Sequence, residues 1–172
     1  MRIREVARRR HDERGFSLIE LTVTMAVIGL MAMIGLPSMQ EWLERYRVRT
    51  AAQEVAAAMQ LQRMRAVSQN DDFSIDFNVG AGTYALYQGD PSSGTLLDPL
   101  PHVLPSGVAY SGDSDPVSTP NDELLFHADG SLNDSTASDD QIFLGNSLGD
   151  VFTVTVNRAT GRVQVAHHAY AY

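Results

Sequence analysis

The chain contains 172 residues with a mass of 18.8 kDa, which is enough for one ordinary domain and an additional segment. Hydrophobic residues make up 44% and charged residues 20%, a balance that argues against wholesale disorder. The net charge of −8 argues against a general nucleic-acid binder, which needs a basic surface. Cysteine is absent, which excludes disulfides, thiol catalysis and thiolate metal sites.

The chain begins with a basic segment that is followed at once by an apolar one. Six arginines stand against three acids between Met1 and Gly15, a local balance of +3. The next 21 residues, Phe16–Leu36, carry one charge, Glu20. As a helix they would be about 30 Å long, close to the thickness of the bilayer's hydrocarbon core. This order predicts a single membrane-spanning helix with a cytoplasmic N-terminus and an exported C-terminal domain.

Two other interpretations of the apolar stretch fit less well. An ordinary secretory signal has a shorter apolar region and a small-residue cleavage site, and neither is found around Leu36. A buried core helix would leave the arginine-rich segment without a purpose. The carboxylate of Glu20 is costly in hydrocarbon, so either it has a partner or a function, or it reaches back to the membrane surface.

The residues Arg14–Leu21, with the sequence RGFSLIEL, resemble the class III signal of type IV prepilins and pseudopilins. The resemblance implies that a membrane-embedded prepilin peptidase cleaves between Gly15 and Phe16, so that residues 1–15 form a cleaved leader. It also implies N-methylation of Phe16. In this family the matching glutamate, here Glu20, pairs with the terminal amine of a neighbouring subunit during filament assembly. Leaving either charge unpaired in a low dielectric is penalised, so the pair would fix the register of the subunits.

The helical pattern continues beyond the apolar stretch. Pro37 removes one helical hydrogen bond, so a kink is expected there, between a membrane and assembly half over residues 16–37 and an amphipathic half over residues 38–69. In the second half one apolar stripe recurs at helical spacing and is expected to dock on the chain's own domain. Trp42 and Tyr46 suit the aromatic belt at a membrane interface. The stripe consists of Val48, Ala52, Val55, Met59 and Ala66.

Residues 70–172 are expected to form an acidic β-domain. From Val67 to the end, 14 acids stand against two arginines, a balance of −12. Turns are expected at Gly80–Gly82, Asp129–Gly130 and Ala159–Gly161, and residues 90–121 are expected to be a long irregular connection. The predicted strands are Phe73–Phe77, Thr83–Gln88, Gly107–Tyr110, Glu123–His127, Gln141–Leu144, Val151–Asn157 and Arg162–Ala166.

Two of these segments resemble the GspH/FimT group of minor pseudopilins and minor pilins. Leu124–Ser131 is similar to the group's strand and Asp-Gly turn, and Val154–Val163 to its C-terminal hairpin with a Gly-Arg-Val ending. The resemblance covers the N-terminal helix and the last third of the chain. It implies an α+β, pilin-like fold: a long N-terminal transmembrane helix packed against an antiparallel β-sandwich.

Several patterns suggest sites but are weak. Five residues between Asp129 and Asp140 fall at spacings similar to a calcium loop, yet Asp134 stands where that loop needs glycine. A polar loop is favoured, with a low-affinity calcium site as the alternative. His167–His168 is interpreted as a solvated tail, because neighbours on a strand point to opposite faces. Gly112–Asp113–Ser114 lacks a histidine partner motif. We therefore expect no metal, no cofactor and no enzymatic activity.

The favoured function is that of a minor pseudopilin of type II secretion, a structural subunit at or near the tip of a periplasmic pseudopilus. The alternative is a minor pilin of a type IV pilus, of the FimT or FimU type and linked to DNA uptake. Direct DNA binding is disfavoured because only Arg158 and Arg162 supply positive charge in the β-domain. The expected partners are other pilins or pseudopilins, the prepilin peptidase and the bacterial inner membrane.

Overall fold

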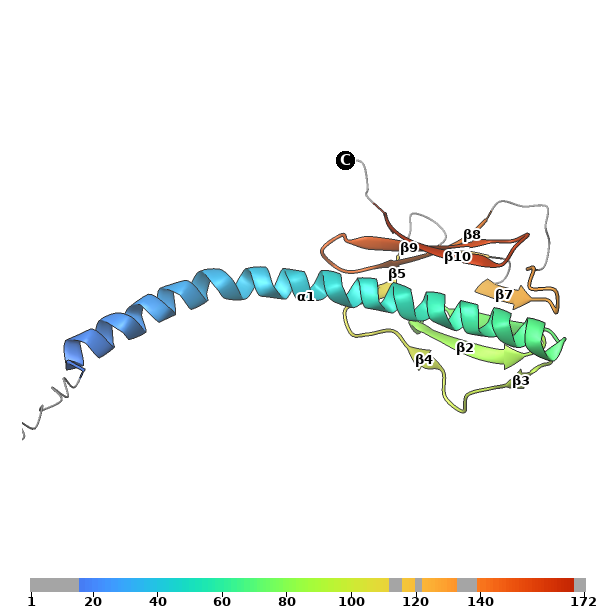
Figure 1. Ribbon diagram of the computed structural model, residues 1–172, viewed down its shortest axis with the longest axis horizontal. Coiled ribbons are helices and arrows are strands. Elements are labelled where there is room, and N and C mark those ends of the chain that lie inside the picture. Colours follow the sequence, from blue (N-terminus) through green and yellow to red (C-terminus); the bar gives the residue numbers. More distant parts are fainter. Residues whose placement is uncertain (1–15, 112–115, 120–121, 133–138, 169–172) are drawn as a thin grey trace, which may run out of the picture. The chain divides into compact units, whose positions relative to one another are not determined.

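The computed structural model describes residues 16–111, 116–119, 122–132 and 139–168 (Figure 1). One helix, α1 (Leu18–Gln69), precedes all the strands. Contacts divide the chain into two compact units, Met1–Met39 and Gln40–Tyr172, so that α1 contributes to both.

The first part of α1 is predominantly apolar. Its best 18-residue window has a mean hydropathy of 2.0 and is not buried by other parts of the chain. Thr22 and Thr24 donate their hydroxyl hydrogens to the carbonyls of Ile19 and Leu21, both at 2.8 Å, so these polar side chains are satisfied within the helix. Within the described residues, α1 is the one helix long and apolar enough to cross a membrane.

The second part of α1 is amphipathic and ends sharply. The five residues of the predicted apolar stripe are all buried, which confirms that this face docks on the chain's own domain. Asn70 follows the last helical residue in the left-handed conformation, with φ at 52°. Asparagine tolerates this conformation better than most residues, and it commonly terminates helices there.

All strand pairings in the two sheets of the second unit are antiparallel. The first sheet has the order β3-β2-β1-β7, with β4 also paired to β2. The second has the order β10-β9-β8-β5, with β6 also paired to β8. The strands are β1 (Phe73–Asn78), β2 (Thr83–Gln88), β3 (Thr95–Leu96), β4 (His102–Val103), β5 (Ala109–Tyr110), β6 (Val117–Ser118), β7 (Glu123–Phe126), β8 (Asp140–Gly145), β9 (Val151–Asn157) and β10 (Arg162–His168).

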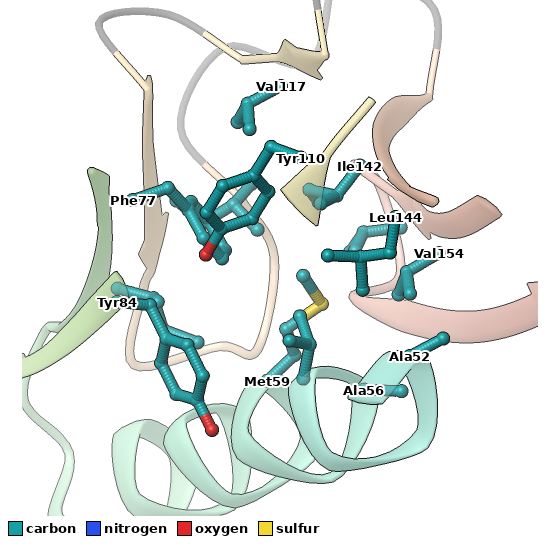
Figure 2. Close-up of a cluster of buried hydrophobic side chains, with 14 of the residues drawn as sticks. Ala52, Ala56, Met59, Phe77, Tyr84, Tyr110, Val117, Ile142, Leu144 and Val154 are labelled. Carbon is teal, nitrogen blue, oxygen red and sulfur yellow. The ribbon is translucent and has the colours of Figure 1, made fainter. Parts of the chain in front are cut away.

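The core of the second unit lies between the helix and the two sheets. Figure 2 shows Ala52, Ala56 and Met59 of α1 in one cluster with side chains of both sheets. The first sheet contributes Phe77 and Tyr84, whose rings lie 6.4 Å apart between centroids. The second contributes, among others, Tyr110, Ile142, Leu144 and Val154. Alanines on the buried helical face let the backbone approach the sheets closely. The predicted α+β architecture of one long helix on antiparallel sheets is thus confirmed.

The prediction for residues 90–121 was wrong in part. This connection contains the short strands β3, β4 and β6, in addition to β5, which lies within the predicted strand Gly107–Tyr110. It also supplies the buried side chains of Leu104, Val108, Tyr110 and Val117 to the core. Two-residue strands are too short to show an alternating pattern in the sequence, and the surrounding prolines, serines and glycines hide them.

Candidate functional site

The residues of the signal motif lie at the start of α1. Phe16 precedes the first helical residue, and its side chain is exposed, as is Glu20 within the first helical turn. Gly15 lies outside the described residues. Pro37 lies inside α1, which the structure assigns as one continuous helix. Proline has no N–H, so one carbonyl in the preceding turn has no helical donor.

Gln62 joins the helix to the first sheet and was not predicted to be buried. Its amide nitrogen donates to the backbone carbonyls of Ser74 in β1 at 2.8 Å and of Tyr87 in β2 at 3.2 Å. Arg65 donates to the amide oxygen of Gln62 at 3.0 Å. Both polar atoms of this fully buried amide, the nitrogen and the oxygen, therefore have hydrogen-bond partners, as burial requires. The sequence held a signal, since Gln62 stands three residues after Met59 and four before Ala66, within the apolar stripe.

Arg63 joins the helix to two glycine turns. Its Nε donates to the carbonyl of Gly130 at 3.2 Å. A side chain at Gly161 would collide with the backbone oxygen of Gly130 and would place its first carbon 2.6 Å from Arg63 Nε. Both glycines have positive φ, 81° at Gly130 and 62° at Gly161, which other residues rarely adopt. The two turns predicted from the sequence therefore meet over α1.

The Asp-Gly turn is also held by its own side chains. Ser131 donates its backbone N–H and its hydroxyl to Asp129 Oδ1, at 2.8 and 2.6 Å. These hydrogen bonds lower the pKa of the Asp129 carboxyl, the serine hydroxyl contributing most. The turn at Asp129–Gly130 is thus held by hydrogen bonds between its own residues.

Arg158 is not the surface base that the sequence suggested. It is buried with Asp140, and its Nε donates to Asp140 Oδ1 at 3.1 Å. Its backbone carbonyl accepts from the N–H of Leu132 at 2.9 Å. Burial raises the pKa of the Asp140 carboxyl, against the opposing effect of the hydrogen bond from Arg158. Arg158 therefore ties the turn after β9 to β8 and cannot present its charge to a large ligand.

A polar groove of about 530 Å³ lies beside the junction of Arg63 with the β9–β10 turn. It contains both Arg63 and Arg162 but also Asp139, whose Oδ1 accepts from the amide of Asn157 at 2.9 Å. The groove is therefore mixed in charge and does not form the continuous basic strip that nucleic acid requires.

The outer face of the first sheet concentrates negative charge. Asp76 of β1 stands directly opposite Glu123 of β7 in the antiparallel register. Burial raises the pKa of both carboxyls, and neighbouring carboxylates raise them further: Asp122 for Asp76, and Asp90 and Asp76 for Glu123. Like charges that face each other across strands destabilise the sheet, so this face is electrostatically strained.

The other patterns singled out in the sequence form no site within the described residues. No group of three or more metal-ligating side chains occurs there. Asp140 of the suggested calcium loop is bound to Arg158, and Asn133 and Ser135 lie outside the described residues, as does Gly112–Asp113–Ser114. His167 lies in β10 and not in a tail, and its ring packs edge-on against Phe152, with ring centroids 5.0 Å apart.

Two family models match this chain. The family model described as "Type II transport protein GspH" matches residues 51–161, which is more than half of the chain. The chain belongs to the GspH family. A second model, the prokaryotic N-terminal methylation motif, matches residues 10–36 of this GspH-family chain and so includes the predicted cleavage position, Gly15–Phe16, and Glu20.

Relatives of the GspH-family chain fall into two groups. A fimbrial protein of Pseudomonas aeruginosa is 42% identical over 45 residues, which is 26% of this chain and 29% of that protein, so the match spans under a third of its length. Crystal structures show the same fold at low identity. The type IV minor pilin FimU of P. aeruginosa aligns with a TM-score of 0.54 and 22% identity, over 73% of this chain and 92% of FimU.

The second structural relative comes from a secretion system. The minor pseudopilin EpsH of the Vibrio cholerae type II secretion system aligns with a TM-score of 0.53 and 13% identity, over 74% of this chain and 99% of EpsH. The resemblance to pilin-like proteins inferred from the sequence is thus confirmed. The GspH-family chain shares its fold with a minor pilin of type IV pili and with a minor pseudopilin of type II secretion.

Proposed function

We propose that the chain is a minor pseudopilin of a type II secretion system and that it takes its place at or near the tip of the periplasmic pseudopilus. The observation that carries this proposal is the GspH family match over residues 51–161, which follows an N-terminal methylation motif over residues 10–36. Its role is structural. The helix would pack among other pilin helices, and the β-domain would present a specific surface to neighbouring subunits.

The proposed maturation follows from the signal motif. Residues 1–15 are the leader, the peptidase cleaves between Gly15 and Phe16, and the new amino group of Phe16 is methylated. Residues 16–37 anchor the chain in the inner membrane and later take part in assembly, and residues 38–69 continue as the amphipathic half of the helix. The β-domain from residue 70 onward lies in the periplasm. Pro37 is proposed to kink the helix at the junction of its two halves.

Processing is tested by co-expressing the full chain with a prepilin peptidase and measuring the intact mass. We expect loss of residues 1–15 and a mature N-terminus at methylated Phe16, whereas Gly15→Leu keeps the leader. A matched control, Gly29→Leu, changes a glycine further along the helix where a side chain meets no neighbour and should leave cleavage unchanged. A mature chain that begins at any other residue contradicts the proposal.

The alternative is a minor pilin of a type IV pilus, of the FimT or FimU type. The observation that favours it is the 42% identity with a fimbrial protein over 45 residues. Deleting the gene separates the two functions. Loss of protein secretion with intact pili supports the pseudopilin, and loss of surface pili with intact secretion supports the minor pilin.

A link to DNA uptake would need a basic contact surface. Of the two arginines in the β-domain, Arg158 is buried with Asp140, which leaves Arg162 in a groove that also holds Asp139. We therefore expect the full chain to show no salt-sensitive shift of duplex DNA in a gel. A shift that Arg162→Ala abolishes would reverse this expectation.

A further inference from the structure

Three segments of the second unit gather at one of its ends: residues 42–46 of α1, the loop before β5, and the turn between β8 and β9. Arg45 Nε donates to Asp150 Oδ2 at 3.2 Å, which ties the turn to the helix. A side chain carbon at Gly107 would lie 3.5 Å from Glu44 Oε2, which places the loop there as well. Figure 1 shows the turn between β8 and β9 beside α1.

This end carries large apolar side chains that are exposed. The rings of Trp42 and Tyr46 stack with centroids 5.6 Å apart and an interplanar angle of 18°. They remain 63% and 55% exposed. Leu148, at the tip of the β8–β9 turn, is 52% exposed, and its N–H is held by Asn146 Oδ1 at 3.0 Å. We call these three residues, Trp42, Tyr46 and Leu148, the aromatic end.

The position of the aromatic end in the chain indicates what covers it. Trp42 follows the last residue of the apolar stretch, Leu36, by six positions, which is about 9 Å of helix and no more than about 21 Å of extended chain. Side chains of a helix tilt toward its N-terminus, here toward the apolar stretch. Tryptophan and tyrosine prefer the boundary between hydrocarbon and water, where the ring is apolar and the N–H or O–H stays hydrated.

The charged residues around the aromatic end indicate whether it binds an anionic or an apolar surface. The charged side chains there are Glu41, Glu44, Arg45, Arg47 and Asp150, and Arg45 already pairs with Asp150. Acids outnumber bases, so an anionic surface gains nothing by binding. The attraction must come from apolar contact.

We propose that the aromatic end contacts the lipid headgroup layer of the membrane that holds the chain before assembly. This inference rests on the proposed membrane anchoring. Trp42, Tyr46 and Leu148 would then fix the height and orientation of the second unit above the bilayer. These side chains would leave the lipid when the subunit enters a filament. Assembly must therefore compensate for the lost free energy of this contact.

Trp42 is the one tryptophan of the sequence, so the intact chain reports on this site directly. The experiment reconstitutes the full chain in phosphatidylcholine vesicles whose lipids carry bromine either near the headgroup or near the end of the acyl chain. We expect a blue-shifted Trp42 emission and quenching about twofold stronger by the shallow bromine, because tryptophan sits at the interface. Addition of anionic lipid or of salt should leave the quenching unchanged.

Two variants place the single tryptophan at another position of the chain. Trp42→Phe with Leu148→Trp should be quenched like the parent chain. Trp42→Phe with Met64→Trp is the matched control, because Met64 is 62% exposed on the same helix, 22 residues further along. It should show no quenching. Equal quenching at positions 42 and 64, or none at position 42 in a chain that floats with the vesicles, overturns the inference. A chain that does not float overturns membrane anchoring and the inference together.

Discussion

A single buried polar residue, Gln62, connects the helix to the first sheet. Gln62 is surrounded by apolar neighbours on the helix, yet its amide reaches two carbonyls that face each other across β1 and β2. Unlike the apolar stripe, which could slide along a sheet, these hydrogen bonds require one register. Gln62 therefore gives the packing of the helix its specificity.

Gln62→Leu is expected to lower the free energy of unfolding by about 2 kcal/mol, because two buried carbonyls lose a donor while the side-chain volume is kept. The measurement is urea unfolding of the full chain in detergent, followed by far-UV circular dichroism. Gln60→Leu is the control, since Gln60 is an exposed residue of the same type on the same helix. A similar decrease in the free energy of unfolding in both variants would show that the buried hydrogen bonds of Gln62 do not stabilise the fold.

The buried pair of Arg158 and Asp140 leads to a second prediction at this scale. Asp140→Asn removes the carboxylate charge that pairs with the buried guanidinium and should cost about 3–5 kcal/mol. Replacing both residues, with Asp140→Leu and Arg158→Met, should recover most of that loss because the desolvation of two charges disappears. The same unfolding measurement tests both variants. A double variant less stable than Asp140→Asn would contradict this account.

At the scale of elements, the pairing of β1 with β7 sets Asp76 against Glu123. Because the pKa of each carboxyl is raised in the folded chain, folding favours the protonated forms. The contribution of these two carboxyls to stability should therefore become more favourable as the pH falls through their pKa values, and it should be least favourable where both are ionised.

Asp76→Asn is expected to stabilise the chain by about 0.5 kcal/mol at about pH 7, with the gain fading at about pH 3 where the carboxyls are protonated. Urea midpoints across that range provide the measurement. Asp71→Asn is the contrasting variant, since the hydrogen bond from Gln88 at 2.8 Å lowers the pKa of Asp71. That change should destabilise the chain at neutral pH. A change in stability of the same sign for Asp76→Asn and Asp71→Asn at neutral pH would refute the explanation.

How far the elements could be predicted depended on their length and regularity. The long strands β2 and β9 were predicted with their observed bounds, because six or seven alternating residues carry a clear period. The two-residue strands β3, β4 and β6 have no period to read. The buried state of Arg158 was also missed, since its partner Asp140 lies 18 residues away in sequence and only strand pairing brings them together.

The residues of the candidate site also differ in how far they could be predicted from the sequence. The motif that contains Phe16 and Glu20 is a contiguous sequence signal and could be recognised without coordinates. The meeting of Gly130 and Gly161 over Arg63 could not, although both turns were predicted, because their contact depends on the relative placement of β7, β9 and the helix.

For the whole molecule, the proposed role depends on Glu20. Glu20→Ala should leave cleavage after Gly15 intact, because the glutamate lies beyond the scissile bond. Incorporation into a filament should fall severalfold, since the amine of the neighbouring Phe16 would lose its counter-charge in a low dielectric. Glu41→Ala, which removes an exposed carboxylate of the same helix beyond the apolar stretch, is the control. Crosslinking in sheared filament fractions measures incorporation, and unchanged levels for Glu20→Ala would reject the role.

Two consecutive residues of α1 have a mechanical consequence for such a filament. Gln62 is bonded to β1 and β2 of the first sheet, and Arg63 reaches the turn after β7 and lies against the turn between β9 and β10. A pulling force along the helix would therefore load both sheets at the same point and at the same moment. We expect the second unit to yield in one step at high force, rather than strand by strand, when the chain is stretched by its ends.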